Sequence, residues 1–415
     1  MELIRDMIRH IVTVRLAPST RLKRPNSPAA KSLPSMCDRL PAMISLRMLL
    51  VLATPIFLVL IALNLSPPSP SLPFPPHPVS ESERRDLKKE EGKGQDLSGR
   101  SQEVRWTRGE RPWRQVVASW DKKFKVPSRA EGPVLNPYPD QVTFLVNEEK
   151  ACKDTPLALA LVVTAPSNAK KRHFIRNTWG HPALVEVTGI RPIFIVGQTA
   201  DPAAQASLSH ETSQYHDVIQ ANFRDSYQNL TYKTTALLTW ASTYCPSTPI
   251  VLKIDDDVIP NPIALQKWLI NFLESNPHPS EILGKERCCD PVLRSGKWGV
   301  SNEDYPGNSY PPYVAGPSYM VPMPVVSALL HAVRRTQFLF LEDVYTTGLA
   351  AKKGSISHYN IFTLTNSLPN KIDVLWCSGA RVFQENVGLK EATRGWNKIR
   401  ELEGITEPPE YIFTP

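Results

Sequence analysis

Short continuous apolar runs, separated by more polar segments, constrain the fold of this chain more than any other feature. The clearest runs are residues 157–165 (LALALVVTA), 192–197 (PIFIVG) and 249–254 (PIVLKI), and a further strand is expected at 217–220. Apolar runs of this length without alternation are typical of strands that are buried on both faces of a parallel sheet.

The segments between these runs are expected to be helices, residues 168–178 and 227–244. Alternation of strand and helix predicts an α/β domain with a mainly parallel sheet. In such sheets, ligands bind beyond the carboxyl ends of the strands. The run PIVLKI is followed at once by Asp255, Asp256 and Asp257, so we expect the functional site at that strand end.

Three adjacent carboxylates repel one another and need a counter-charge. Oxygen ligands favour a hard divalent cation such as Mg²⁺ or Mn²⁺, which keeps coordination positions for water and phosphate oxygens. Such an ion would bind the diphosphate of a nucleotide and stabilise charge on it. Lys253 adds positive charge nearby or caps the strand. The alternative is an acidic turn with no ligand, after which Val258 returns to the core.

Other chemistries lack their motifs. Cys288 and Cys289 are adjacent, but no second Cys or His pair follows at a zinc-ligand spacing. The chain has no G-x-S-x-G, G-x-G-x-x-G or G-x-x-x-x-G-K-[ST] motif. The net charge of +8 comes mostly from residues 1–47, so the rest of the chain offers no basic face and we expect no nucleic-acid partner.

Residues 48–65 carry no charge and come close to the length of a membrane-spanning helix. Basic residues precede this segment, and the first one after it is Arg84. The positive-inside rule therefore predicts a cytosolic N-terminus and a lumenal C-terminal part. A cleaved signal peptide and a mitochondrial targeting segment are the alternatives.

The sequence after the predicted anchor is rich in proline and then in charge, which predicts an extended stem without a packed core. The predicted organisation has four parts: a basic cytosolic tail (1–47), a transmembrane anchor (48–65), a stem (66–150) and a lumenal domain (151–415).

Six segments in the predicted domain carry a family resemblance. They are KRHFIRNTWG (171–180), IFIVG (193–197), NFRDSYQNLTYKT (222–234), VLKIDDDV (251–258), YPGNSYPPYVAGPSYMV (305–321) and LEDVYTTG (341–348). In this order they resemble the β-1,3-galactosyltransferase and β-1,3-N-acetylglucosaminyltransferase family. The resemblance implies a GT-A nucleotide-sugar-binding fold, a type II anchor in the Golgi membrane, and Mn²⁺-dependent transfer with inversion, with Mg²⁺ as an alternative ion.

The resemblance also implies roles for the acidic residues. Asp257 is the direct metal ligand, and Asp255 and Asp256 hold the nucleotide and the metal-bound waters, with Asp255 also assigned to the metal. Asp343 is the base that deprotonates the acceptor hydroxyl, and Glu342 is the reserve candidate. Acidic residues also favour the first turn of a helix, so the pair could equally mark a helix start.

Further residues are assigned to the nucleotide-sugar site by the same resemblance. Arg176 lies in an R-x-T-W motif whose Trp179 could equally be a core residue. Lys253 and Gly316 are assigned to the donor site, although Gly316 could merely serve a turn. Asn229 begins an N-glycosylation sequon, Asn-Leu-Thr.

One departure from the family concerns the metal site. A histidine near the C-terminus often completes that site in the family, whereas residues 380–396 contain none. Gln384 and Glu385 are the candidates to replace it.

The predicted function is transfer of galactose from UDP-galactose to a terminal sugar of a glycoprotein or glycolipid glycan. An N-acetylhexosaminyltransferase that uses UDP-GlcNAc or UDP-GalNAc is the alternative, and a non-catalytic lumenal binding protein is the alternative of another class. The predicted partners are the UDP-sugar, the glycan acceptor and the membrane. The sequence predicts no particular oligomeric state.

Overall fold

The computed structural model describes residues 111–368 and 371–405. The predicted tail, the anchor at 48–65 and the first part of the stem lie outside the described residues. Within the described ranges, no helix combines the length and the apolar character that a membrane crossing needs.

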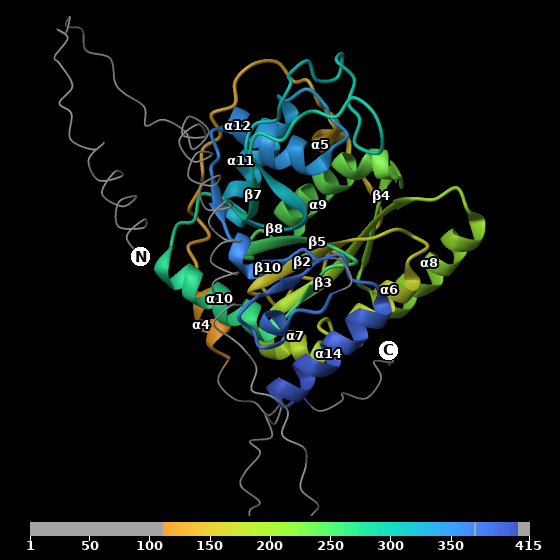
Figure 1. The fold of residues 1–415 in the computed structure, drawn as a ribbon, viewed down its shortest axis with the longest axis vertical. Coiled ribbons are helices and arrows are strands. Elements are labelled where there is room, and N and C mark those ends of the chain that lie inside the picture. The colour runs from red at the N-terminus through yellow and green to blue at the C-terminus, as the bar shows by residue number, and fades with distance from the viewer. Residues whose placement is uncertain (1–110, 369–370, 406–415) are drawn as a thin grey trace, which may run out of the picture. The chain divides into compact units, whose positions relative to one another are not determined.

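A twisted sheet forms the centre of the domain (Figure 1). It has eight strands in the order β1-β4-β3-β2-β5-β8-β7-β9. The strands are β1 (Phe144–Val146), β2 (Ala158–Val163), β3 (Ile190–Gln198), β4 (Val218–Arg224), β5 (Ile250–Asp255), β7 (Ile282–Arg287), β8 (Tyr313–Pro322) and β9 (His358–Asn360). Strands β4, β3, β2 and β5 are parallel to one another, and β8 runs antiparallel between β5 and β7. The four parallel strands expected from the sequence are confirmed, and their carboxyl ends share one edge of the sheet.

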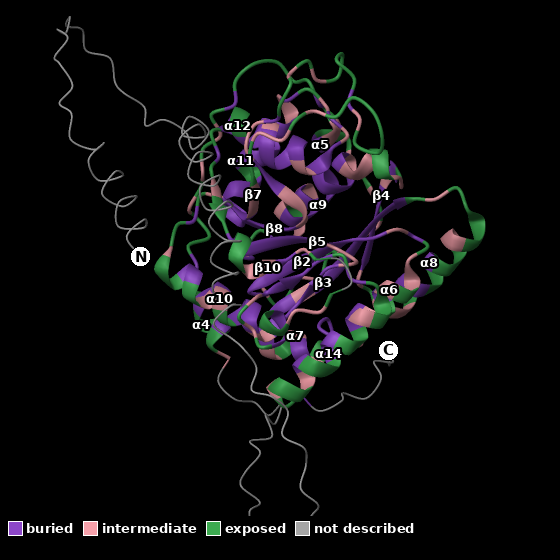
Figure 2. Ribbon diagram, in the orientation of Figure 1, coloured by how far each residue is buried: buried purple, intermediate pink, exposed green. Residues whose placement is uncertain are grey.

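Helices cover both faces of this sheet. Successive residues of a buried strand point to opposite sides of the sheet, so each strand contributes side chains to the apolar core on both faces. In β2, Ala158, Ala160 and Val162 belong to one apolar cluster, and Leu159 and Leu161 belong to another. Burial on both faces explains the continuous apolar sequence of this strand, which is purple in Figure 2.

The first cluster contains buried residues of α4 (Pro112–Ser119), α6 (Ala169–Arg176), α7 (Pro182–Thr188), α8 (Pro202–Tyr215), α10 (Pro262–Ser275) and α14 (Leu389–Glu403). The second contains buried residues of α9 (Leu230–Tyr244), α11 (Met323–Arg334) and the π-helix η3 (Val344–Ala350). The remaining helices are short: α5 (Tyr138–Gln141), η2 (Tyr227–Asn229), α12 (Ala351–Gly354), η4 (Phe362–Leu364) and α13 (Val374–Cys377). Helices predicted at 168–178 and 227–244 are confirmed as α6 and as η2 with α9. The domain is a mixed α/β fold with a mainly parallel central sheet.

A small second sheet lies next to the carboxyl end of β5. It has the order β10-β11-β6, from β10 (Thr365–Asn366), β11 (Phe383–Gln384) and β6 (Ile259–Pro260). The main-chain amide of Val387 donates to the carbonyl of Asp257 across 3.0 Å, so the C-terminal segment is fastened to the aspartate triplet.

The folded domain begins earlier in the chain than the sequence predicts. Residues 111–150 were assigned to the stem, but Trp113 and Trp120 are buried in the first apolar cluster and strand β1 pairs with β4. The high charge of the predicted stem suggests that it has no packed core, but α4 has an apolar face on which Val116 and Val117 are also buried. The disulfide Cys152–Cys245 joins the segment before β2 to the end of α9.

Candidate functional site

The carboxyl end of β5 brings together most of the residues that the sequence assigns to the site. The carboxylates gathered here are called the acidic cluster: Asp255, Asp256, Asp257, Glu342, Asp343 and Glu385. Strand β8 pairs with β5 in a register that sets Ile254 opposite Ser318, and Gly316, two residues before Ser318, lies at the same end of the sheet. Glu342 and Asp343 lie at the start of η3, where Asp343 caps the helix. The hydrogen bond from Gly316 to Asp343 joins this helix start to β8. Three segments of sequence therefore meet at one edge of the sheet.

Lys253 is the central cation of this cluster, and its side chain is only 4% exposed. Its ammonium donates to Oδ1 of Asp255 across 2.6 Å and to the carbonyl of Gly316, and it lies 3.6 Å from Oε2 of Glu342. Burial by itself would favour the neutral amine, but the charges of Asp255 and Glu342 raise the pKa of Lys253 above its ordinary value. The lysine is thus a permanent positive charge in the cluster.

The carboxyl groups of Asp255 and Asp343 both have pKa values above the ordinary value for aspartate. Burial raises the pKa of Asp255 to about 7, although the neighbouring Lys253 acts in the opposite direction. Burial and the charge of Glu342 raise the pKa of Asp343 to about 6. Two acids with displaced pKa values at the carboxyl edge of a sheet are typical of a functional site.

Asp343 is fixed by main-chain donors on both carboxylate oxygens. The amide of Val344 donates to Oδ1 across 2.9 Å, and the amide of Gly316 donates to Oδ2 across 3.1 Å. Each oxygen can still accept a second hydrogen bond. The predicted helix start and the predicted base are therefore compatible at this one residue.

Glu342 is more enclosed than Asp343. Its Oε1 accepts a hydrogen bond from the hydroxyl of Tyr319 across 2.6 Å, and its Oε2 faces Lys253. Tyr319 is fully buried. Both oxygens of Glu342 are therefore engaged inside the protein, and of the two candidates for a base only Asp343 has oxygens without a side-chain partner among the described residues.

The three aspartates of the triplet have different surroundings. Asp256 is held by three donors, namely Thr164 Oγ1 at 2.7 Å, Asn168 Nδ2 at 2.7 Å and Lys171 Nζ at 2.6 Å. The carboxylate of Asp257 has no hydrogen bond or ion pair within residues 111–368 and 371–405. Asp256 ties β5 to the loop after β2, whereas Asp257 is available to a ligand.

A second polar group adjoins the site, and the sequence analysis did not single it out. Asp225 follows β4, accepts from the amide of Gly197 across 2.7 Å and pairs with Lys233 at 2.8 Å. The Lys233 ammonium also donates to the carbonyl of Thr164 across 2.6 Å. Both residues lie in the motif NFRDSYQNLTYKT, and the position of Asp225 directly after a strand was the available signal.

The two candidates for the missing histidine have different surroundings. Gln384 is fully buried and its amide oxygen accepts from Asn366 Nδ2 across 2.9 Å, so it supports the small sheet. Glu385 is buried at the site, where its carboxylate accepts from Ser367 across 2.6 Å and from Ser318 across 3.4 Å. Burial raises the pKa of Glu385.

Arg176 is not brought to this site. Its guanidinium pairs with Asp217 across 2.7 Å and with Glu211 across 2.7 Å. Asp217 precedes β4, so this network lies at the amino ends of the parallel strands, opposite the acidic cluster. Trp179 is fully buried in the first apolar cluster, which is the core role that the sequence analysis allowed.

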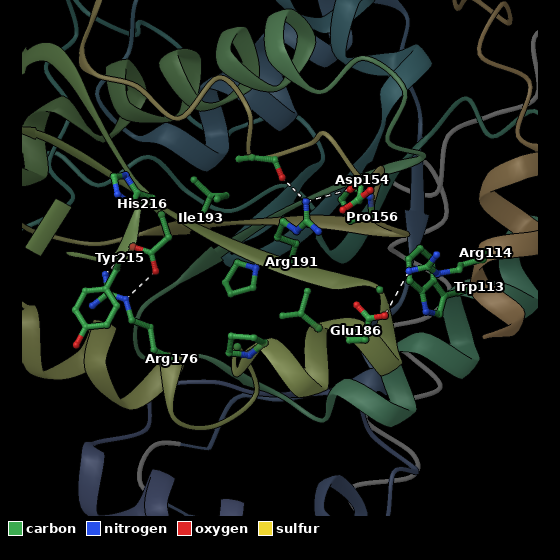
Figure 3. Close-up of a pocket in the computed structure, with 17 residues that line it drawn as sticks. Trp113, Arg114, Asp154, Pro156, Arg176, Glu186, Arg191, Ile193, Tyr215 and His216 are labelled. Atoms are coloured by element: carbon green, nitrogen blue, oxygen red, sulfur yellow. Dashed lines mark hydrogen bonds and ion pairs between the residues drawn. The ribbon is translucent and has the colours of Figure 1, made fainter. Parts of the chain in front are cut away.

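Arg176 and Asp217 line a cavity of about 340 Å³ at that opposite edge (Figure 3). Its charged groups are largely compensated within the protein: Arg191 donates to the carbonyl of Asp154 across 3.0 Å, and Glu186 pairs with Arg114. The nucleotide-binding role predicted for Arg176 gains no support from this arrangement, and the geometry gives it a structural one.

Asn229 lies at the end of η2, on the surface near the acidic cluster. Its side-chain amide donates to the carbonyl of Arg224 across 2.8 Å, and it is partly exposed. Thr231 of the same sequon is buried, and its hydroxyl donates to the carbonyl of Leu339.

Comparison with known proteins gives a consistent result. The Galactosyltransferase family profile matches residues 170–361. Beta-1,3-galactosyltransferase 1 of Homo sapiens and of Mus musculus are each 30% identical over 272 residues, which is 63% of this chain and 79% of each relative. Lactosylceramide 1,3-N-acetyl-beta-D-glucosaminyltransferase of Xenopus tropicalis is 31% identical over 235 residues, or 53% of this chain. The chain spans 60% of the length of that frog protein.

The matched residues 170–361 include β5, β8 and the start of η3, and hence the whole acidic cluster apart from Glu385. Among solved structures, S. aureus TarS superposes with a TM-score of only 0.28 at 13% identity, over 61% of this chain and 67% of that one. The identity and coverage of the galactosyltransferase relatives show that this chain belongs to the β-1,3-glycosyltransferase family.

Proposed function

We propose that this chain is a metal-dependent, inverting β-1,3-glycosyltransferase that moves galactose from UDP-galactose to a terminal sugar of a glycoprotein or glycolipid glycan. One observation carries the proposal. An unpartnered carboxylate, Asp257, and an oriented candidate base, Asp343, lie at the same edge of the sheet. Gly316 contacts both Lys253 and Asp343 there. The mixed α/β fold with a mainly parallel sheet is consistent with a GT-A-type domain.

The donor set fits a hard divalent cation. Within the described ranges no group of three or more His, Cys, Asp or Glu side chains is arranged to hold a metal, so the protein would contribute only one or two carboxylates. This is the usual situation for Mn²⁺ or Mg²⁺ bound together with a nucleotide, where phosphate oxygens and water complete the coordination. Asp257 and Asp255 would hold the ion, and its charge would stabilise the departing UDP.

The protein's own residues account for the remaining chemistry. Asp343 is ionised near neutral pH and its two oxygens are fixed by Gly316 and Val344, so it can take the proton of the acceptor hydroxyl as that oxygen attacks the sugar carbon. The carbon–oxygen bond to UDP breaks on the opposite face, which gives inversion. Lys253 offsets the repulsion among the carboxylates and keeps Asp255 in place.

The named relatives support two donors, because one is called a galactosyltransferase and another an N-acetylglucosaminyltransferase. UDP-GlcNAc or UDP-GalNAc is therefore the alternative donor. A lumenal binding protein without turnover is the alternative of another class. The proposal also includes a Golgi location and an anchor at residues 48–65, both of which rest on the sequence.

A donor screen with the full-length chain tests the proposal. UDP release is measured for UDP-galactose, UDP-GlcNAc and UDP-GalNAc, with Mn²⁺ or with EDTA, on acceptors that end in galactose or an N-acetylhexosamine. The proposal expects Mn²⁺-dependent release with UDP-galactose and a β-1,3-linked product. Release with an N-acetylhexosamine donor alone supports the alternative enzyme. UDP binding without release on any acceptor supports the non-catalytic protein.

A further inference from the structure

Trp298 is a large aromatic side chain that the fold leaves exposed. It is 53% exposed, whereas Trp113, Trp179 and Trp240 are buried. Its indole N–H donates to the hydroxyl of Tyr227 across 2.8 Å, and Tyr227 is itself 40% exposed. Two exposed rings are therefore joined through their polar atoms, and apolar ring surface faces solvent.

The turn that carries Trp298 is tightly built. Gly296 has a φ of +80°, which favours glycine, and its carbonyl accepts from the amide of Gly299 across 3.1 Å. A Cβ atom at Gly299 would stand 2.8 Å from the backbone of Ser295. The backbone around Trp298 thus depends on two glycines.

Arg294 stabilises the same loop through hydrogen bonds to its main chain. Its Nη1 donates to the carbonyls of Val300, Ser301 and Tyr305, and its Nη2 donates to the carbonyl of Gly307 across 2.7 Å. Trp298 is therefore held on an ordered loop. Preorganised aromatic surface loses little entropy when a ligand binds to it.

Lys297 adds a positive charge to the pair. Its ammonium lies 4.4 Å from the ring centroid of Tyr227 and 5.7 Å from that of Trp298. Cation–π contacts of this kind orient the rings. The ammonium also provides hydrogen-bond donors at the edge of the aromatic surface.

The topology sets these rings at the rim of the acidic cluster. Strand β7 runs in the same direction as β5, because both are antiparallel to β8, so the loop after β7 lies at the edge where β5 ends. Tyr227 follows Asp225 at that edge. Burial raises the pKa of Tyr227, the hydrogen bond from Trp298 lowers it, and the charges of Asp343, Asp255 and Glu342 raise it, as expected for a phenol in the neighbourhood of these carboxylates.

We propose that Trp298 and Tyr227 form the platform that receives the hexopyranose ring of the acceptor. One face of a pyranose presents C–H groups that pack on an aromatic ring, and the hydroxyls at its edge need polar partners. Trp298 supplies the ring, and the Tyr227 hydroxyl and the Lys297 ammonium supply the partners. The proposal rests on the proposed function and names the surface that holds the sugar while Asp343 deprotonates it.

The test compares three variants of the full-length chain with the wild type. Trp298→Ala removes the stacking surface, Trp298→Phe keeps a ring without the N–H, and Leu145→Ala is the control. Leu145 is likewise 53% exposed but lies on β1, at the far side of the sheet. Saturation-transfer NMR with lactose, N-acetyllactosamine and methyl β-N-acetylglucosaminide measures binding without turnover. Kinetics give KM for acceptor and donor separately.

We expect Trp298→Ala to lose the saturation-transfer signal and to raise the acceptor KM about tenfold or more, with the donor KM and acceptor-free donor hydrolysis unchanged. Trp298→Phe should recover most of the acceptor affinity, and Leu145→Ala should match the wild type. An unchanged acceptor KM in Trp298→Ala, or no signal from any of the three sugars with the wild type, overturns the platform. Wild-type protein that binds the sugars through Trp298 but turns over no UDP-sugar keeps the platform and overturns the enzyme.

Discussion

The main-chain amide of Gly316 donates to Oδ2 of Asp343 across 3.1 Å, and a Cβ atom at position 316 would stand 3.2 Å from the same oxygen. Strand β8 and the start of η3 therefore touch at the atom that would take up the proton. Glycine is needed there because of the close approach of the carboxylate, since the backbone of Gly316 does not have a positive φ. The turn role that the sequence left open for this glycine is not the one that the structure shows.

Gly316→Ala should lower kcat while the protein stays folded. The added methyl group would press on Asp343 and shift it by a few tenths of an ångström, so the expected loss is about tenfold to a hundredfold, as for other small misplacements in active sites. The affinity for Mn²⁺ and UDP, measured by calorimetry, should be nearly unchanged. Wild-type kcat in this variant would contradict the proposed role of Asp343.

The pH dependence of kcat/KM should show an acidic limb near pH 6. Asp343 has a raised pKa of about 6, so it is protonated below that pH and cannot accept a proton, and activity rises as the pH increases through that value. Glu342→Gln removes a charge that raises the pKa of Asp343 and should move the limb to lower pH. Asp343→Asn should lower kcat by about two to four orders of magnitude at every pH. A limb that stays in place in Glu342→Gln would exclude Asp343 as its source.

Asp257 and Asp256 are adjacent carboxylates whose substitutions should affect different properties, turnover for Asp257 and stability for Asp256. Asp257→Asn should leave thermal stability unchanged and lower Mn²⁺-dependent turnover by about two to three orders of magnitude. Asp256→Asn should lower the free energy of unfolding by about 1–3 kcal/mol, because it weakens charge-assisted bonds to Thr164, Asn168 and Lys171. Thermal unfolding with and without Mn²⁺ and UDP separates the two effects. Equal stability loss in both variants would contradict the distinction.

Arg176→Met should destabilise the domain without weakening UDP binding. The substitution leaves Asp217 without its cation, whereas Glu211 keeps its pair with Arg172. The loss of one partner in such a nearly buried network costs about 3–5 kcal/mol. Urea unfolding measures the cost, and calorimetric titration with UDP and Mn²⁺ measures the site. A large loss of UDP affinity in folded protein would restore the nucleotide-binding role that the sequence predicts.

The parallel strands and the helices between them follow from the sequence because β2, β3 and β5 are buried on both faces and read as unbroken apolar runs. Strand β8 does not, because Gly316 and Pro317 interrupt its apolar residues and such residues usually mark the end of a strand. Gly316 of this strand accepts a hydrogen bond from Lys253 and donates one to Asp343. This contact between Lys253 and Asp343 through Gly316 could not be predicted from their positions in the sequence.

The triplet was predicted as a group, but the different surroundings of its members could not be. Asp256 is tied to Lys171 and Thr164, which lie far from it in sequence, so its partners depend on the packing of β2 against β5. The same holds for Arg176, whose motif suggested a ligand but whose partner Asp217 is brought to it by the start of β4. The order of the motifs indicates the family, whereas the partners of each residue depend on tertiary contacts.

The bridge between Cys152 and Cys245 closes a stretch of 93 residues that contains β2, β3, β4 and α9. A cross-link over so long a stretch removes much of the freedom of the denatured chain. Glutathione keeps such thiols reduced in the cytosol, so recombinant production should use a secretory host or an oxidising strain. The choice of host therefore bears on every measurement described above.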